Sequence, residues 1–377
     1  MCSSDLQLER HISLAVAYNI WQYYQVTGDE EFMSFYGAQM MFEIARFWAS
    51  KIEYDEKLER YRILRVMGPD EFHDSYPHRS EAGIDDNAYT NAMAAWLFWR
   101  SLEILDTLPD ERRRFTMEDL GLKEEEIRNW DRMSRKLHIP FHDGVISQFE
   151  GYSELKEFDW EGYREKYGDI HRLDRILEAE GDSPNRYKAS KQADVLMLFY
   201  LLSAEELHQL FGRLGYEFDG EAIPRTVDYY LHRTAHGSTL SRVVHAWVLA
   251  RSHRELSWRL FQDALESDVE DIQGGTTHEG IHLGAMAGTV DLILRGYSGM
   301  ESRDEVLWFN PCLPPRIRSV SFAVRYRGAR IDVDIKTDKI RLYSRPSTER
   351  PITIGLEGET RELSPGEVIE IAAQCGV

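Results

Sequence analysis

The chain has 377 residues, of which 42% are hydrophobic, and it carries a formal net charge of −20. Its length exceeds what most single domains need, and its apolar content is ample for a sizeable core. The strong negative charge argues against binding to nucleic acid or to anionic membranes, because phosphate groups repel an acidic protein.

The first six residues do not continue smoothly into the amphipathic run that follows them. We interpret residues 1–6 as a non-native scar, translated from a sequencing adapter on a truncated gene, and exclude them from the fold analysis.

The cysteines and the hydropathy pattern indicate a compartment. Cys2, Cys312 and Cys375 are far apart and form no metal-type pair. Reduced thiols are therefore expected. Since no signal peptide and no membrane-length apolar run is recognisable, the predicted location is the cytoplasm.

Helical patterns dominate the first 300 residues. Two long helices joined by a turn at 27–29 are predicted between residues 8 and 51, and residues 54–66 have strand or loop character. A helix that is apolar nearly all round begins after Asp86, as expected for a helix packed on both sides. Residues 106–188 are charged and mixed, with one expected helix at 123–137. Further helices are expected after this stretch, at 191–202, 204–211, 239–251, 257–265 and 280–295.

The pattern changes near residue 310, where short alternating strands replace helices. The expected strands are 319–326, 329–335, 340–343, 352–354 and 368–371. We therefore predict a helical domain over residues 7–310 and a β domain over residues 311–377. An α/α toroid or barrel is the natural closed form of successive helical hairpins, although periodicity alone does not distinguish it from a solenoid.

A turn followed by an amide-rich helix start provides candidate sugar chemistry. Glu71 lies in Gly-Pro-Asp-Glu, a rigid turn that can hold a proton donor over a cavity. His73 and Asn87 lie close by in sequence and offer neutral or polar groups for sugar hydroxyls. The alternative is a surface turn with an exposed carboxylate.

Residues 235–241 precede a helix and combine an imidazole with several hydroxyls. His236, Ser238 and Thr239 would converge with free N–H groups at the helix start, where the dipole favours an anion. Ordinary capping by Ser238 is the alternative. Lys191 and Gln192, at another predicted helix start, would add positive charge and hydrogen bonds for an anionic substrate, or lie in solvent.

The run 278–282 matches the H-E-x-x-H pattern of zinc peptidases, with His278 and His282 as ligands and Glu279 as base. We treat this as the weaker alternative, because the motif lies at a glycine-rich helix start rather than inside a helix. His282 is better suited to an anion or sugar contact, and we predict no metal.

Together, these blocks resemble the inverting disaccharide phosphorylases of glycoside hydrolase family 65, which include maltose, trehalose and kojibiose phosphorylases. The blocks occur in the family's order and extend from about residue 7 to 299. They are GPDEFH at 68–73, DNAYTN at 86–91, QFEGY at 148–152, KQADV at 191–195, HGSTLS at 236–241 and GTTHEGIH at 275–282.

The resemblance implies a mainly α fold, an (α/α)6 barrel followed by a small β-sandwich domain. It also implies that Glu71 is the general acid, that Lys191 and Gln192 line the sugar and phosphate region, and that Ser238, Thr239 and His282 bind phosphate. An α-glucosidic bond would be cleaved by phosphate to give β-glucose 1-phosphate and a released sugar. Phosphate would be a co-substrate, and no cofactor is expected.

The family places a β-sandwich, a linker and the first barrel helices before the region that this chain covers. We therefore expect a partial barrel, an exposed apolar face on the first helices, little activity from this chain alone and a homodimer in the full-length form. An inverting α-glucoside hydrolase of the same fold and a non-catalytic carbohydrate-binding relative remain alternatives. The disaccharide linkage stays open, because residues 74–85 could shape the acceptor subsite or form a surface loop.

Overall fold

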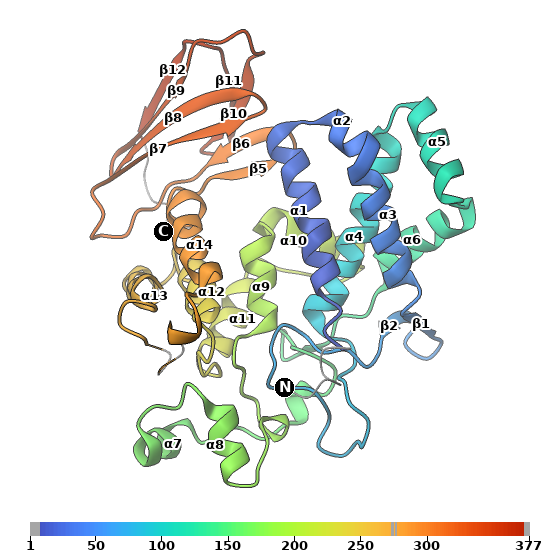
Figure 1. Cartoon of the computed structure of the whole chain (residues 1–377), viewed down its shortest axis with the longest axis vertical. Helices are drawn as coiled ribbons and strands as arrows, with labels where there is room; N and C mark the ends of the chain where they lie inside the picture. The colour runs from blue at the N-terminus through green and yellow to red at the C-terminus, as the bar shows by residue number, and fades with distance from the viewer. Residues whose placement is uncertain (1–7, 273–274, 276, 373–377) are drawn as a thin grey trace. The chain divides into compact units, whose positions relative to one another are not determined.

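The structure is a computed structural model that describes residues 8–272, 275 and 277–372 (Figure 1). The proposed scar at residues 1–6 therefore lies outside the described residues. The chain packs as two compact units, one formed by residues 8–19 and 34–241 and the other by residues 20–33 and 242–372. Helix α1 (Ile12–Thr27) runs from the first unit into the second.

The first unit is built mainly from helices. Its longer helices are α3 (Ala38–Ala49), α4 (Ala88–Thr107), α5 (Asp110–Leu120), α6 (Glu124–Lys136), α7 (Trp160–Tyr167), α8 (Leu173–Ala179), α9 (Asp194–Leu201), α10 (Ala204–Arg213) and α11 (Ala222–Leu231). Two short hairpins, β1 (Ile52–Asp55) with β2 (Arg60–Ile63) and β3 (Phe141–His142) with β4 (Val145–Ile146), connect them. The expected helical pair at the start is confirmed, with α2 (Glu30–Phe32) and a π-helical segment (Met33–Gly37) leading into α3.

Helix α4 is the centre of this unit. It packs against α3, α6 and α9 (Figure 1). Its residues from Ala88 to Phe98 are all buried, which confirms the expected helix packed on both sides. Asn87 caps its first turn by accepting the N–H of Thr90 at 2.9 Å, which satisfies one of the helix's free donors.

Several boundaries differ from the sequence reading. The charged stretch after residue 106 contains α5, α7 and α8, which were not predicted. Helix α9 begins at Asp194, so Lys191 and Gln192 lie in the preceding loop rather than in the helix. Its N-cap residue is Ala193, whose backbone is extended, and this ends the loop.

Besides the end of α1 and α2, the described part of the second unit contains three α-helices, the first of which, α12, begins at the end of the first unit. They span α12 (Thr239–Val248), α13 (Arg254–Glu266) and α14 (Leu283–Asp291), and a π-helical segment (Leu292–Tyr297) continues α14. A side chain at Gly288 would place its Cβ 2.6 Å from Val243 Cγ1, so glycine is what lets α14 approach α12 this closely.

The second unit continues into two four-stranded sheets, ordered β11-β10-β6-β5 and β12-β9-β8-β7 (Figure 1). The strands are β5 (Glu301–Arg303), β6 (Val306–Phe309), β7 (Ser319–Tyr326), β8 (Ala329–Lys336), β9 (Lys339–Ser344), β10 (Ile352–Leu356), β11 (Glu359–Leu363) and β12 (Val368–Ala372). In β8, Ile331, Val333 and Ile335 are buried in alternation, as the period-two pattern predicts. Strands β5 and β6 precede residue 311, where the sequence analysis placed the start of the β domain, and β6 pairs in parallel with β10.

Helix α1 exposes the apolar residues that the sequence analysis expected. Ile12, Val16 and Tyr23 are 60%, 43% and 45% exposed, on a helix without a charged residue. Such a stripe is typical of a helix face that another chain segment or molecule covers.

Two further observations concern the expected compartment. Cys312 is disulfide-bonded, so the expectation of reduced thiols is wrong for this residue. Among the described residues, the helices are all too short or too polar to cross a bilayer.

Candidate active site

Glu71 lies at the tip of a turn whose other side chains point inward. Its own side chain is 34% exposed. Asp70 and Phe72, on either side, are almost fully buried. Phe72 belongs to an apolar cluster that includes Leu173 and Leu177 of α8, so burial of this ring fixes the turn and leaves the Glu71 carboxylate accessible.

The carboxylate of Asp70 holds this turn to two other loops. Its Oδ1 accepts the backbone N–H of Lys191 at 2.8 Å, and its Oδ2 accepts Nε2 of Gln148 at 2.7 Å. The Nδ1 of His73 lies 3.2 Å from the same Oδ2. A buried carboxylate with several donors is stabilised by them, so Asp70 ties three segments that are remote in sequence.

A second buried carboxylate lies directly behind the first. Asp194 accepts the backbone N–H of Asp70 at 2.5 Å through Oδ1 and Nδ2 of Asn87 at 2.8 Å through Oδ2. Burial raises the pKa of Asp194 well above its usual value, and the nearby charge of Asp70 adds to this rise. Gly68 is needed here, since an added Cβ would lie 2.0 Å from Asp194 Oδ2 and 2.5 Å from Asn87 Nδ2.

His73 and Asn87 were predicted to bind the sugar, and their positions require a correction. Both are 0% exposed. The Nε2 of His73 lies 3.0 Å from the carbonyl oxygen of Tyr187, while Asn87 caps α4 and bonds to Asp194. Because both side chains are covered by protein and hydrogen-bonded within it, they support the Glu71 turn and do not contact substrate.

Lys191 and Gln192 lie against the Glu71 turn. The Nζ of Lys191 lies 2.9 Å from Oε2 of Glu71. Gln192 donates through Nε2 to the carbonyl oxygen of Pro69 at 2.8 Å. Its Oε1 is buried and has no hydrogen-bond partner within the described part of the chain, so this oxygen has an unused capacity to accept a hydrogen bond.

The loop before α12 lies against Lys191. The N–H of Gly237 donates to the Lys191 carbonyl oxygen at 3.2 Å, and a Cβ on Gly237 would lie 3.0 Å from Lys191 Cγ. His236 has a left-handed backbone with φ of +53°, an uncommon conformation found often at functional sites. Its Nδ1 is 2.9 Å from Oγ of Ser241, which fixes the ring over the helix start.

Ser238 and Thr239 form the first turn of α12. The Oγ of Ser238 accepts the N–H of Leu240 at 3.3 Å, which is the capping contact that the sequence analysis gave as the alternative to an anion site. Thr239 is 5% exposed. Capping does not prevent anion binding, because the remaining N–H groups and the helix dipole still favour negative charge.

His282, in the second unit, is held by a carboxylate. The imidazole Nδ1 of His282 lies 2.6 Å from Oδ1 of Asp268, and the backbone N–H of His282 donates to Oδ2 of Asp268 at 2.8 Å. The hydrogen bond from His282 lowers the pKa of Asp268. This contact orients the imidazole, as carboxylates that are hydrogen-bonded to a functional histidine commonly do.

The zinc-peptidase pattern is not arranged for zinc. That chemistry needs both imidazoles on one helix. Residues 277–279 instead form a 3-10 turn, Gly280 has φ of +140°, and His282 precedes α14, which begins at Leu283. The two histidines of the motif therefore belong to different local structures.

Within the described ranges, one group has metal-type spacing. One ligand atom from each of Asp86, His138 and Glu150 lies within 4.8 Å of the others. Arg62 pairs with Asp86 at 2.6 Å and places its own positive charge there. Because the guanidinium already compensates the buried carboxylate, this group is a structural ion-pair cluster.

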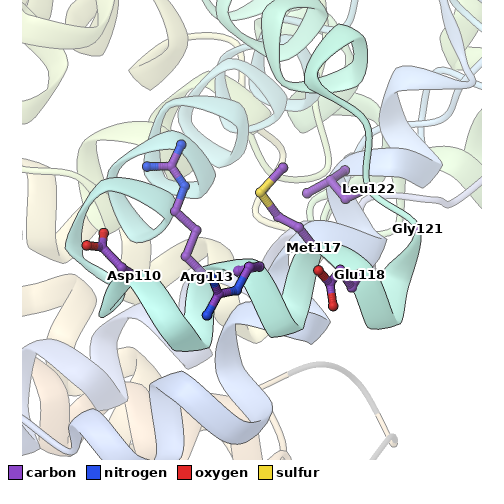
Figure 2. Close-up of a pocket in the computed structure, with 7 residues that line it drawn as sticks. Asp110, Arg113, Met117, Glu118, Gly121 and Leu122 are labelled. Atoms are coloured by element: carbon purple, nitrogen blue, oxygen red, sulfur yellow. The ribbon is translucent and has the colours of Figure 1, made fainter.

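A cavity of about 520 Å³ lies along α5 (Figure 2). It is lined by Asp110, Arg113, Arg114, Met117, Glu118, Gly121 and Leu122. None of these residues was predicted to belong to the site. The long side chains at the rim of the cavity face solvent.

Protein-family models and curated sequences match this chain over most of its length. The model of the glycosyl hydrolase family 65 central catalytic domain matches residues 3–291, and that of the family's C-terminal domain matches residues 300–363. An uncharacterized glycosyl hydrolase of Mycobacterium tuberculosis is 53% identical over 361 residues, which are 96% of this chain and 27% of that protein. Trehalose 6-phosphate phosphorylase of Lactococcus lactis is 39% identical over 338 residues, 89% of this chain and 42% of that enzyme.

Among solved structures, a putative kojibiose phosphorylase from the human microbiome matches with a TM-score of 0.77 and 24% identity, covering 96% of this chain and 46% of that one. This match confirms the predicted fold class, a helical domain of the barrel type followed by a β domain. The chain spans less than half the length of these relatives. The two family models together cover most of the sequence, and the chain belongs to glycosyl hydrolase family 65.

Proposed function

We propose that this chain contributes the catalytic region of an enzyme that cleaves an α-glucosidic disaccharide with inorganic phosphate, with inversion at the anomeric carbon. The supporting observation is the connected arrangement of Glu71, Lys191 and the start of α12. Lys191 links the other two features. Its Nζ lies 2.9 Å from the partly exposed carboxyl of Glu71, and the residue also contacts Gly237, just before the helix start that favours an anion.

In the proposed reaction, Glu71 gives its proton to the glycosidic oxygen as the bond from this oxygen to the anomeric carbon breaks. A phosphate oxygen attacks the same carbon from the opposite face of the sugar ring. The products are β-glucose 1-phosphate and a sugar whose hydroxyl carries the transferred proton. Phosphate is already an anionic nucleophile, so the second carboxylate that an inverting hydrolase uses to activate water is not required.

Positioning of phosphate is proposed for Ser238, Thr239 and His236, and a phosphate contact of the His282 imidazole, in the second unit, stays a separate prediction. The N–H groups of the α12 start, the hydroxyls and the imidazole of His236 would supply the local positive potential that a chain of net charge −20 otherwise lacks. The sugar hydroxyls would meet Gln192, whose Oε1 has no partner within the described residues.

The test is product analysis of the full-length enzyme, encoded by the complete gene, with a panel of α-linked glucobioses and phosphorylated glucobioses, each with and without phosphate. Phosphate-dependent formation of β-glucose 1-phosphate supports the proposal. Release of free glucose at the same rate without phosphate would show a hydrolase instead. Sugar binding without either product would show a non-catalytic relative.

A general-acid role for Glu71 has its own signature. Glu71→Gln should lower turnover of a disaccharide by about 10²–10⁴-fold. The loss should be much smaller with α-glucosyl fluoride, because fluoride leaves without a proton. Glu157→Gln is the matched control, since Glu157 also pairs with a lysine, Lys188 at 3.2 Å, outside the proposed site. Equal losses on both substrates would reject the acid assignment.

A further inference from the structure

Lys191 contacts both halves of the proposed site. Its Nζ lies 2.9 Å from the Glu71 carboxylate. Its Cγ lies beside Gly237, where an added Cβ would approach to 3.0 Å, one residue before Ser238. The main chain of Lys191 is fixed at both ends of the residue, since its N–H bonds to Asp70 and its carbonyl oxygen to Gly237. Only the side chain can therefore move between the acid and the helix start.

The pairing raises a question about the proton. An ion pair with Lys191 requires Glu71 as a carboxylate, whereas a general acid must carry a proton. The same lysine is also joined to the loop before α12, because its carbonyl oxygen accepts the N–H of Gly237. One cation therefore has two possible anionic partners, and it satisfies fully only one of them at a time.

We propose that Lys191 couples anion binding to protonation of Glu71. In the protein without ligand, Lys191 neutralises Glu71. When a dianion binds at the start of α12, the ammonium group moves to it, and the Glu71 carboxylate, now unpaired and close to a second negative charge, takes a proton from solvent. An O–H bond forms on Glu71 as the bond to hydrogen breaks in a hydronium ion or buffer acid, and no bond of the bound anion or of Lys191 breaks. This inference rests on the proposed function, and it means that the acid becomes competent only after the nucleophile is bound.

Other charged groups face this pair and remain in place during the exchange. Asp70 is saturated by donors, and Asp174 of α8 is paired with Arg172 at 3.0 Å. The titratable and charged groups on the neighbouring elements include Asp70, His73, His171, Arg172, Asp174, Asp194 and His236. Asp174 also interacts electrostatically with Lys191. Lys191 is the cation that pairs with the Glu71 carboxylate, at 2.9 Å, so the proposal makes protonation of Glu71 depend on the position of Lys191.

Sulfate is a suitable probe, because it resembles the phosphate dianion but does not itself titrate near neutral pH. Calorimetric titration of the full chain with sulfate at about pH 6, in buffers of different ionisation enthalpy, measures protons taken up per anion bound. We expect uptake of a fraction of one proton for the native sequence. Glu71→Gln should abolish the uptake and bind sulfate about two- to tenfold more tightly, because Lys191 loses its competing partner.

Two variants make the result specific. Glu157→Gln removes the same charge from another lysine pair, in which Arg233 also contacts Glu157, and should leave proton uptake unchanged. Lys191→Gln should weaken sulfate binding and also abolish the uptake. Thermal unfolding shows whether each variant is folded before it is titrated.

Sulfate binding without proton uptake in the native sequence, or equal affinity in Glu71→Gln, would overturn the coupling. Phosphorolysis in the product assay would still stand in that case, so the two failures are distinguishable. Phosphorolysis without measurable binding of sulfate or inorganic phosphate would likewise overturn the coupling, since it would show that the anion binds only after the sugar.

Discussion

Replacement of Gly68 by alanine tests whether the buried network behind Glu71 is as tight as the structure shows. Gly68 does not have a positive φ, so the backbone itself tolerates alanine. The new Cβ would lie 2.0 Å from Asp194 Oδ2 and 2.5 Å from Asn87 Nδ2. Neither atom is the end of a long flexible side chain, and both are buried.

The expected cost follows from two terms. Overpacking a dense site costs about 1–3 kcal/mol. Separating Asn87 from Asp194 leaves a buried donor without its partner, which costs about 1–3 kcal/mol more. Gly68→Ala should therefore lower the free energy of unfolding by about 2–6 kcal/mol and should also lower turnover, because the Glu71 turn loses its support.

Urea unfolding followed by tryptophan fluorescence measures this change. Gly212→Ala is the matched control, because this glycine lies in α10 and an added Cβ meets no atom within 4 Å. That control should raise the free energy of unfolding by about 0.5–1 kcal/mol. If Gly68→Ala unfolds at the same urea concentration as the native sequence, the close approach of Gly68 to Asp194 is wrong and the support argument fails.

Three other outcomes are expected. Arg62→Met should lower the free energy of unfolding, measured with urea, by about 3 kcal/mol. The reason is that the carboxylate of Asp86, which is 0% exposed, loses its cation. An unchanged urea midpoint would contradict this. Lys166 and two tyrosines lower the pKa of Glu180 to about 2, so the stability that this carboxylate adds is present above its ordinary pKa of 4.5 and is lost as the pH falls toward 2. Glu180→Gln should remove that part of the acid sensitivity, measured as unfolding temperature against pH, and identical curves would refute it. A metal chelator should change neither unfolding temperature nor turnover, whereas zinc peptidase chemistry would require a loss of both.

Local signals were enough to predict the elements that present the site. The sequence analysis placed the start of helix α4 after Asp86, and the structure has Asn87 as the N-cap of α4, one residue later. The alternating residues of β7 and β8 were also recognisable. By contrast, α5 buries only Thr116, so it has no apolar face for a pattern to reveal.

The support of the site could not be predicted from local pattern. Asp70 and Asp194 were quoted within motifs but received no role, because a carboxylate in an acidic chain is normally solvated. Their contact joins positions 124 residues apart. One available signal was the sequence after Asp194, which is apolar throughout α9 and therefore indicates a buried acid. His73 and Asn87 were misassigned for the related reason that sequence does not show which side of a turn faces the protein.

The misread HExxH motif has a physical explanation. A five-residue pattern presumes helical backbone throughout, and Gly280 interrupts it with a conformation that other residues seldom adopt. Ligand spacing in sequence had no geometric meaning once that presumption failed.

The buried network behind Glu71, formed by Asp70, Asn87, Gln148 and Asp194 around Gly68, has a consequence for laboratory evolution of linkage preference. Random substitution at positions 68, 70, 87, 148 or 194 would produce mainly misfolded variants. The four side chains are held by hydrogen bonds to their neighbours, and position 68 has no room for a side chain. Residues 77–82 include several exposed positions and lie in the same connecting segment. Randomisation there can vary how an acceptor is received while the proton donor keeps its place.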